Sequence, residues 1–367
     1  MRRALILVLA WLPAATIGQP RGFDFPGGAA TGDYAVADAP RRFEFPADHG
    51  AHPQFRSEWW YFTGNLEAKD GRHFGFQLTF FRDALAPQAV ERESKWAANQ
   101  AWMAHFTLTD TASGRMHQAE RIARGALGLA GAKAAPFRVW LDRWQAVSLA
   151  ADGSLFPLRL EAEQAPAAIK LELTALNPRV LQGQEGWDRK GPEPGSASYY
   201  YSYTRLAARG QVQLDGQSFD VEGTAWMDRE WSSGALGADL AGWDWFGLQL
   251  SDGSELMFYR LRGRDGGAGP FSAGALVLAN GEKIELKRDD VRLEARRHWR
   301  SPRGDRSYPV AWTLEVPSRG VLLEIEPRVD DQEVDLSVRY WEGAIRARGV
   351  AGGQPVSGQG YLELVGY

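Results

Sequence analysis

The stretch Gly223–Trp231 reads G-T-A-W-M-D-R-E-W and places two tryptophans, an aspartate, an arginine and a glutamate within nine residues. If residues 219–228 form an extended strand, alternation directs Trp226 and Asp228 to the same face. A carboxyl group would then stand beside an indole ring, in a site that could hold a large apolar ligand and give it one proton. The alternative is that Asp228 pairs with an arginine and the tryptophans belong to the core, because buried ion pairs also shift the pKa of carboxyl groups.

Aromatic runs surround this stretch. Tyr199–Tyr203 precedes it, and Trp243 and Trp245 follow it. Elsewhere, short runs rich in aromatic and branched residues are separated by Asp-Gly and other turn pairs, which is typical of β-hairpins. Only residues 90–98 and 289–297 have a helical pattern. Many short strands at even spacing favour a barrel or a sandwich, so we predict an all-β chain with few helices.

One hairpin pattern occurs twice. Trp59–Arg82 runs from an aromatic strand through Asp70-Gly71 into a second aromatic strand, and Trp243–Arg260 does the same through Asp252-Gly253. Each hairpin opens a block of regularly spaced short strands. We interpret the two blocks as two copies of one β architecture.

Composition limits the possible functions. The 367 residues suffice for roughly two domains. The net charge of -4 leaves no dominant basic face, so we do not expect a nucleic-acid partner. The chain has no cysteine, which removes disulfides, zinc–thiolate sites and cysteine nucleophiles. The six histidines lack metal-ligand spacing, and neither a G-x-S-x-G elbow nor a nucleotide-binding glycine motif occurs, so we expect no metal and no cofactor.

The N-terminus has the order of a secretory signal. Arg2 and Arg3 precede the apolar run Ala4–Leu12, and small residues follow. We predict cleavage of this segment on export to the bacterial periplasm; an uncleaved N-terminal anchor is the alternative. The chain is then predicted to divide into a signal peptide, a lead-in linker, an N-terminal domain and a C-terminal domain, at residues 1–19, 20–45, 46–234 and 235–367.

Three runs together carry a family resemblance. They are H-P-Q-F-R-S-E-W-W-Y-F-T-G at His52–Gly64, S-Y-Y-Y-S-Y-T-R at Ser198–Arg205, and the Gly223–Trp231 stretch. In this order they resemble the AttH-like family, which is related to carotenoid 1,2-hydratase (hydroxyneurosporene synthase). The resemblance runs from about Phe43 to the C-terminus. It implies two lipocalin-like, calycin-type antiparallel β-barrels packed side by side.

The resemblance also implies catalytic residues. In the hydratase branch an aspartate two residues after an aromatic supplies a proton, and aromatics of the preceding strand line the same cavity. Carried onto this chain, these are Asp228 with Trp226, Tyr199 and Tyr201. Burial raises the pKa of such an acid, and indole and phenol faces attract the cation that protonation of a double bond creates. A nearby arginine such as Arg229 would instead lower the pKa and make the aspartate structural.

Further side chains are predicted to contact the ligand: Glu58, Trp60, Gln77, Tyr203, Glu230, Trp243 and Trp245. Glu58 begins a strand, so instead of contacting the ligand it could be solvated at the strand end or paired with an arginine. Gln77 lies in a Phe-rich strand, where a hydrogen-bonded core amide is equally consistent with the pattern.

Two hypotheses for the function follow. The first is an exported protein that binds a hydrophobic small molecule (a lipid, carotenoid or terpenoid-like compound) in an aromatic cavity near the junction of the barrels. Asp228 would then catalyse acid-assisted hydration or isomerisation of a carbon–carbon double bond. The second is a non-catalytic carrier or accessory protein with transient contact to a membrane or membrane transporter. In both we expect a monomer, and the surroundings of Asp228 distinguish catalysis from a scaffold role.

Overall fold

The computed structural model describes residues 33–88, 94, 96–234 and 236–367. The predicted signal peptide, the first part of the lead-in and part of the 90–98 segment lie outside the described residues. Within the described residues the only helices are three single 3-10 turns, η1 (Ala47–His49), η2 (Arg288–Asp290) and η3 (Pro317–Arg319). None of the helices in these ranges is long and apolar enough to cross a membrane.

The first thirteen strands form one antiparallel sheet. Its order is β4-β3-β2-β1-β13-β12-β9-β8-β7-β6-β5, and β10 and β11 pair with β12. The strands are β1 (Ser57–Ala68), β2 (His73–Ala84), β3 (Gln100–Asp110), β4 (Arg115–Arg124), β5 (Ala130–Ala134), β6 (Phe137–Leu141), β7 (Trp144–Ser148), β8 (Leu158–Gln164), β9 (Ala167–Ala175), β10 (Val180–Leu181), β11 (Trp187–Arg189), β12 (Ala197–Leu214) and β13 (Gln217–Ser232).

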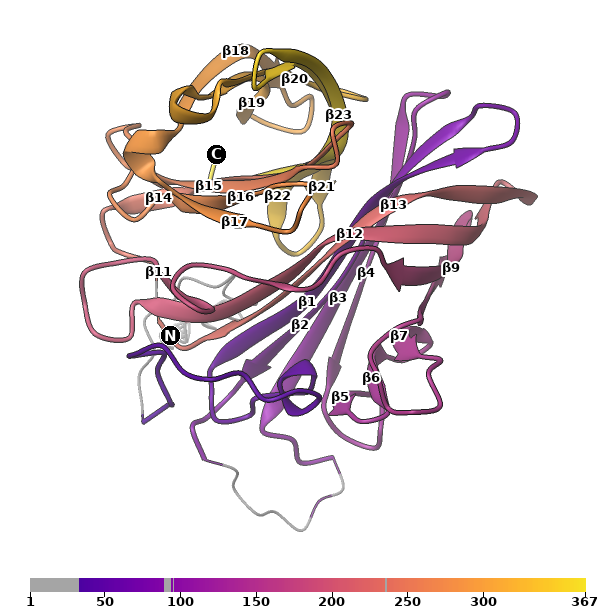
Figure 1. Cartoon of the computed structure of the whole chain (residues 1–367). Helices are drawn as coiled ribbons and strands as arrows, with labels where there is room; N and C mark the ends of the chain where they lie inside the picture. Colours follow the sequence, from indigo (N-terminus) through magenta and orange to yellow (C-terminus); the bar gives the residue numbers. More distant parts are fainter. Residues whose placement is uncertain (1–32, 89–93, 95, 235) are drawn as a thin grey trace, which may run out of the picture.

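The remaining ten strands form a second antiparallel sheet, in the order β17-β16-β15-β14-β23-β22-β20-β19-β18, with β21 paired to β22. The strands are β14 (Leu240–Leu250), β15 (Glu255–Gly263), β16 (Ala273–Val277), β17 (Lys283–Lys287), β18 (Arg292–Arg300), β19 (Ser307–Val316), β20 (Val321–Pro327), β21 (Glu333–Asp335), β22 (Arg339–Ala351) and β23 (Gln354–Val365). Each sheet curls around its own core, as Figure 1 shows. The predicted fold class, two antiparallel barrels side by side, is confirmed.

One local expectation is wrong. Residues 289–297 have a helical pattern, but the structure forms a single 3-10 turn, η2, followed by strand β18. Along β18 exposed and half-buried side chains alternate strictly. Pairing with β19 supplies the strand with backbone hydrogen bonds, and this tertiary pairing outweighs a weak local helix preference.

The two hairpins of the sequence repeat occupy equivalent places. The β1–β2 and β14–β15 turns carry Gly71 and Gly253, both at positive φ, a conformation that favours glycine. In the first hairpin Glu58 faces Arg82 across the strand pair, and the two side chains form an ion pair. In the second hairpin Asp244 faces Arg260, whose Nε lies 2.7 Å from the carboxylate.

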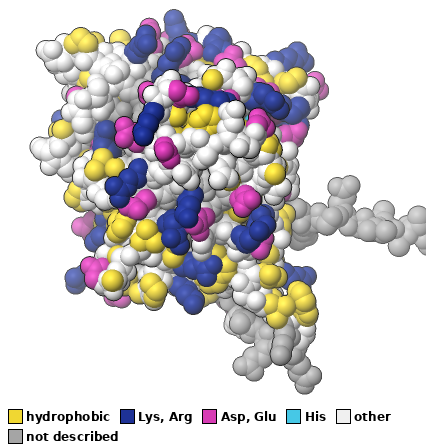
Figure 2. Space-filling model, turned by 90° about the vertical axis from the view of Figure 1, so that its right-hand side faces the viewer, with side chains coloured by type: hydrophobic (Ala, Val, Ile, Leu, Met, Phe, Trp, Pro, Cys, Tyr) yellow, Lys and Arg dark blue, Asp and Glu magenta, His cyan; other side chains and the backbone are white. Residues whose placement is uncertain are grey.

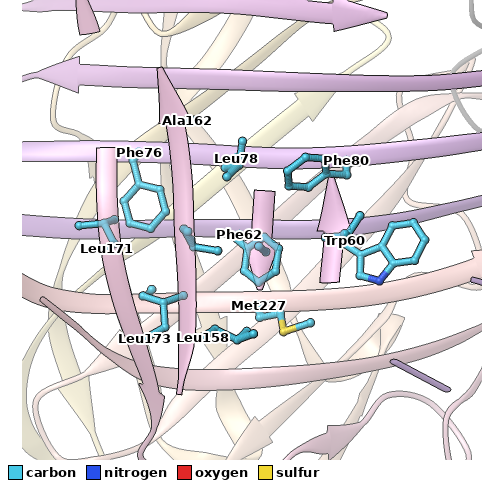
Figure 3. Packing of buried hydrophobic residues seen from close by; sticks show 14 of the residues in the cluster. Trp60, Phe62, Phe76, Leu78, Phe80, Leu158, Ala162, Leu171, Leu173 and Met227 are labelled. Atoms are coloured by element: carbon cyan, nitrogen blue, oxygen red, sulfur yellow. The ribbon is translucent and has the colours of Figure 1, made fainter. Parts of the chain in front are cut away.

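Side chains fill the interiors of both barrels. Figure 3 shows Trp60, Phe62, Leu78 and Met227 packed together inside the first barrel, and all four are buried. A second core, which includes Trp312, fills the other barrel. At about 25 cal/mol for each Å² of buried apolar surface, such cores account for most of the stability of a domain. In the described residues both interiors are therefore packed cores.

A third apolar cluster, smaller than the two cores, lies where the barrels meet. It combines outward-facing residues of the first sheet, such as Tyr200 and Trp226, with Trp245, Tyr259 and Tyr361 of the second. Figure 1 shows the second sheet, in orange and yellow, lying across the outer face of the first near β12. On the face of the molecule in Figure 2, basic and acidic side chains are interspersed and apolar side chains form small separate patches.

Candidate functional site

A cavity lies between the two barrels. It encloses about 1000 Å³, counting the part that is open to solvent. One wall is the outer face of β1, β2, β12 and β13, and the other is the outer face of β14, β15, β22 and β23. Its charged and amide side chains are Gln77, Lys190, Asp228, Glu230, Glu342 and Glu363, and its larger aromatic side chains include Trp59, Tyr61, Tyr200, Trp243, Trp245 and Tyr259.

Asp228 is held in this cavity by neutral hydrogen-bond donors. Its carboxylate accepts hydrogen bonds from the Tyr200 hydroxyl at 2.8 Å, the Ser202 hydroxyl at 2.5 Å and the Trp226 indole at 2.7 Å. Ser202 lies directly opposite on β12, and Trp226 is two residues away on the same face of β13. Strand pairing alone therefore brings these groups together.

Burial is the largest influence on the pKa of Asp228, which is only 4% exposed. Loss of water raises the pKa of Asp228 from 3.8 to about 7, although its three hydrogen bonds act in the opposite direction. The nearby Glu230 carboxyl raises the pKa further. In the described part of the chain no lysine or arginine forms an ion pair with Asp228. The acid is therefore partly protonated near neutral pH.

The neighbouring Arg229 points to the opposite face of β13. Inside the first barrel its guanidinium forms an ion pair with Glu58 and lies 3.9 Å from the ring centre of Trp60. Arg82 forms a second ion pair with Glu58, and the His52 ring is also hydrogen-bonded to that carboxylate, at 3.3 Å. Burial alone would raise the pKa of Glu58, but the two arginines hold it well below its usual range. Glu58 is thus a structural anion.

Three more carboxyl groups share the cavity with Asp228. Burial raises the pKa of Glu363 to about 8, against a 3.2 Å hydrogen bond from the Trp243 indole. Burial and the Glu363 carboxyl raise the pKa of Glu342 well above its usual value. Burial also raises the pKa of Glu230. Carboxyl groups that share a water-poor site cannot all ionise, so Asp228 and Glu363, with pKa values of about 7 and about 8, retain protons near neutral pH.

Lys190 is the one lysine among the described residues that line the cavity. Its Nζ lies 2.5 Å from the Asp188 carboxylate, 3.6 Å from Glu230 and 3.7 Å from the ring centre of Tyr259. Burial would lower the pKa of Lys190, but the two carboxylates raise it above its usual value. Its charge is therefore balanced by Asp188 and Glu230.

Around Gln77 the cavity is lined by polar side chains. The Gln77 amide donates hydrogen bonds to Glu342 at 2.8 Å and to the Tyr340 hydroxyl at 3.0 Å. The Oε1 atom of Gln77 has no hydrogen-bond partner, and the Tyr61 hydroxyl lies next to the Glu342 carboxyl, where a hydrogen bond between them acts to lower the pKa of that acid. Buried polar groups in proteins are nearly always hydrogen-bonded, so this part of the cavity is suited to a water molecule or a ligand hydroxyl.

Rings form the apolar walls. Trp245 packs edge to face against Trp226 at 5.8 Å and against Tyr61 at 5.6 Å, measured between ring centres. The Trp245 indole also donates a 3.3 Å hydrogen bond to the Tyr200 hydroxyl, which itself donates to Asp228. This chain of contacts fixes the ring positions around the acid.

The structure separates the predicted site residues into two groups. Asp228, Gln77, Glu230, Trp243 and Trp245 line the cavity, and Trp226 contacts it through Asp228. The others lie inside the first barrel or at its end: Glu58, Trp60, Tyr199, Tyr201 and Tyr203.

The sequence predicts Tyr199 and Tyr201 beside Asp228, but the tyrosine that lies there is Tyr200, one residue away. Tyr201 bonds to the His49 ring at 2.7 Å and Tyr199 donates to the Ala39 carbonyl, both on the inner face of β12. Tyr200 is the tyrosine beside Asp228. The run Y-Y-Y-S-Y is buried on both faces, so it has no polar alternation from which to assign a face.

Sequence reasoning also missed the second wall of the cavity. Glu342 and Glu363 come from β22 and β23, more than a hundred residues after Asp228. The available signal was a single carboxylate inside the otherwise uncharged runs Tyr340–Ile345 and Gly360–Val365. Within the residues that the structure describes, no cluster of three or more acidic or histidine side chains is arranged to hold a metal ion.

Known structures share this architecture. A crystal structure of a protein assigned as AttH from Nitrosomonas europaea matches 91% of this chain and 99% of its own, with 39% identity and a TM-score of 0.79. Kievitone hydratase from Nectria haematococca matches 93% of this chain and 98% of its own, with 16% identity and a TM-score of 0.69. CghA matches 92% and 95%, with 16% identity and a TM-score of 0.54.

The last two likenesses, at 16% identity, concern the fold alone. No curated protein matches the chain. The sequence profile of the AttH-like family matches residues 36–367, which covers both barrels. The chain is therefore a member of the AttH-like family.

Proposed function

We propose that this protein binds a hydrophobic small molecule, such as a lipid, carotenoid or terpenoid-like compound, in the cavity between its barrels. We further propose that it catalyses acid-assisted hydration or isomerisation of a carbon–carbon double bond. The observation that carries the proposal is Asp228, a buried acid with a pKa of about 7 that faces an aromatic cavity and is held by neutral donors only. A general acid works best when its pKa lies near the working pH.

In the first step the Asp228 carboxyl transfers its proton to one carbon of the double bond. The π electrons form the new C–H bond, the other carbon becomes a cation, and Asp228 becomes a carboxylate. The rings of Trp245 and Tyr61 face this volume and each attract a desolvated cation by about 1–2 kcal/mol. The exclusion of bulk water protects the cation from unselective capture.

In the second step a water molecule adds to the cation. The unpartnered Oε1 atom of Gln77, beside Glu342 and Tyr61, supplies the polar part of the cavity at which this water is held. A water lone pair forms the C–O bond, and the surplus water proton returns to the Asp228 carboxylate. Acid and charge are restored, and one water has been added. In an isomerisation the same carboxylate removes a proton from a neighbouring carbon instead.

The comparisons support this reading at the level of the fold. One structural neighbour is named for a hydration reaction. The side-chain argument is independent of that name, because it rests on the contacts and burial of Asp228. The order of charged, apolar and small residues in segment 1–19 supports export as part of the proposal. Mass spectrometry of the mature N-terminus from the host periplasm tests export separately.

The test begins with native mass spectrometry of protein purified from its own host, which identifies a co-purifying apolar compound. Turnover of that compound is then compared in wild type, Asp228→Asn and Asp220→Asn. Asp220 is an exposed carboxylate on the same strand, so it is a matched control. We expect Asp228→Asn to keep the ligand and lose roughly 10²–10⁴-fold in turnover, while Asp220→Asn behaves as wild type.

Three results would count against the proposal. Turnover that Asp228→Asn leaves unchanged would exclude Asp228 as the acid. No turnover in either protein, with the ligand still bound, would leave a carrier. A cavity that retains no apolar compound and gains no thermal stability from one would remove the binding function too.

A further inference from the structure

The junction between the barrels has a second hollow beyond the cavity. It is a groove of about 830 Å³, counting the part that is open to solvent. Four central strands each carry one cavity residue and one groove residue, four positions apart: Asp228 and Thr224 on β13, Trp245 and Gln249 on β14, Glu342 and Arg346 on β22, and Glu363 and Gln359 on β23. Four strand residues span about 13 Å. The two hollows are therefore neighbours along the same interface.

A layer of side chains separates the groove from the cavity. Midway between the paired positions lie Trp226, Ala344 and Tyr361, all buried in the junction cluster. Gly247 completes this layer, where the Trp245 ring approaches so closely that even a Cβ would meet it at 2.3 Å. The groove is thus a separate site, which opens to solvent on its own side.

The charge of the groove is opposite to that of the cavity. Four arginines and no acidic residue line it: Arg205, Arg328, Arg346 and Arg348. Arg205 is paired with Glu255. Within the described residues, Arg328, Arg346 and Arg348 form no ion pair. The Nε of Arg328 is buried and has no hydrogen-bond partner. Three guanidinium groups therefore face a shared hollow without an anion to balance them.

The acidic groups around the groove do not fill this role. Glu326 faces Arg346 across the β20–β22 pair, but its carboxylate forms an ion pair with Arg297 at 3.1 Å. Glu324 lies opposite Arg348, and both are exposed, but the two side chains form no ion pair in the described structure. Glu67 attracts Arg328 from a distance without an ion pair, while Arg346 and Arg348 repel it. The arginines outnumber these unpaired carboxylates.

Neutral side chains form the floor of the groove. Gln359 donates a 3.1 Å hydrogen bond to the Thr224 hydroxyl, and Gln249 donates to the carbonyls of Thr204 and Ala225. These bonds fix the floor in place. The Nε of Arg328 has no partner, and guanidinium forks match the oxygens of phosphate in pairs.

We propose that this groove binds a tetrahedral oxyanion of the phosphate type through Arg328, Arg346 and Arg348. The anion replaces the missing counter-charge and relieves the repulsion among the three guanidinium groups. The same chemistry is presented by free inorganic phosphate and by the phosphodiester headgroup of an anionic lipid. The site is independent of the proposed catalytic function, because it shares no residue with the cavity.

The test measures phosphate binding to the full chain by titration calorimetry at low ionic strength, in wild type and in Arg328→Gln/Arg346→Gln. Arg292→Gln is the matched control, because Arg292 is an exposed arginine of the same barrel, paired with Glu315 at 3.3 Å. We expect the double variant to lose roughly tenfold or more in affinity, and Arg292→Gln to change it less than about twofold. Without phosphate, the double variant should be as stable as wild type or more so.

The source of the anion is tested by co-sedimentation with phosphatidylglycerol vesicles, using phosphatidylcholine vesicles as the neutral comparison. Sedimentation that free phosphate competes away, and that the double variant loses, indicates a lipid headgroup. Phosphate binding without vesicle binding indicates a free oxyanion. If wild type binds neither probe, or if Arg292→Gln loses as much affinity as the double variant, the groove is not an anion site.

Discussion

Glu58 and Asp228 are both buried carboxyl groups on neighbouring strands of one sheet, with 0% and 4% exposure. The pKa of Glu58 is nevertheless lowered from its usual value, whereas the pKa of Asp228 is raised. Glu58 points into the first barrel and is bound by Arg82 and Arg229. Asp228 points into the junction and is bound by two hydroxyls and an indole. Burial raises the pKa of both, and for Glu58 the charges of Arg82 and Arg229, with a smaller effect from His52, reverse it.

The face of the sheet on which each carboxyl group lies determines whether it is ionised. Arg229 follows Asp228 directly in the sequence, but alternation sends it to the other face, where it neutralises Glu58. A shift of β13 by one residue would exchange the two environments. The interior face thus gives a stable structural ion pair, and the junction face gives an acid that retains its proton.

The largest expected effect comes from removing one of the two arginines that pair with Glu58 inside the first barrel. Arg229→Met leaves Glu58 with a single arginine in a water-free core. We expect the free energy of unfolding to fall by about 3–5 kcal/mol, as when one partner of a buried ion pair is removed. Urea unfolding followed by tryptophan fluorescence measures it.

The control for that variant is Arg209→Met, which removes an exposed arginine paired with Glu172. It should cost about 0–1 kcal/mol. Equal losses in the two variants would show that the Glu58 network contributes no more than a surface pair.

The next effect concerns the pH dependence of stability. Between the ordinary pKa of 3.8 and the folded pKa of about 7, the folded state binds more protons at Asp228 than the unfolded state does. Stability from this group is therefore full at low pH and is lost as pH rises through the window. Asp228→Asn removes this dependence. As pH rises from about 5 to 8, the free energy of unfolding of wild type should therefore fall by about 2–3 kcal/mol relative to that of the variant.

Urea unfolding at each pH measures this difference, with Asp220→Asn as the control that should follow wild type. Parallel curves for Asp228→Asn and wild type would mean that the acid titrates alike in the folded and unfolded states.

The smallest expected effect is a shift in the pKa of Asp228 that depends on which face of β12 is changed. Tyr200→Phe removes a hydrogen bond to the charged form of Asp228, so the pKa of Asp228 should rise by about one unit. Tyr201→Phe changes a hydroxyl on the opposite face, which contacts His49, and should leave the pKa of Asp228 unchanged. Carbon-13 NMR of the labelled aspartate carboxyl measures both. The same shift in both variants would contradict the assignment of faces.

The sequence predicts the strands well but assigns the site only in part. Asp-Gly pairs mark hairpin turns such as the one with Gly71, and the two-residue spacing of Trp226 and Asp228 along a strand fixes their shared face. The face of Tyr200 could not be predicted, because a strand covered on both sides lacks alternation. Glu342 could not be placed either, since only the packing of one barrel on the other brings it to Asp228.

The most direct test of the account is the ionisation of Asp228 itself. Difference infrared spectroscopy of wild type against Asp228→Asn follows the protonated carboxyl band as a function of pH. The account predicts that the band of Asp228 disappears with a midpoint near pH 7. A midpoint near the ordinary value of 3.8 would contradict it, because the acid would then be fully ionised at neutral pH.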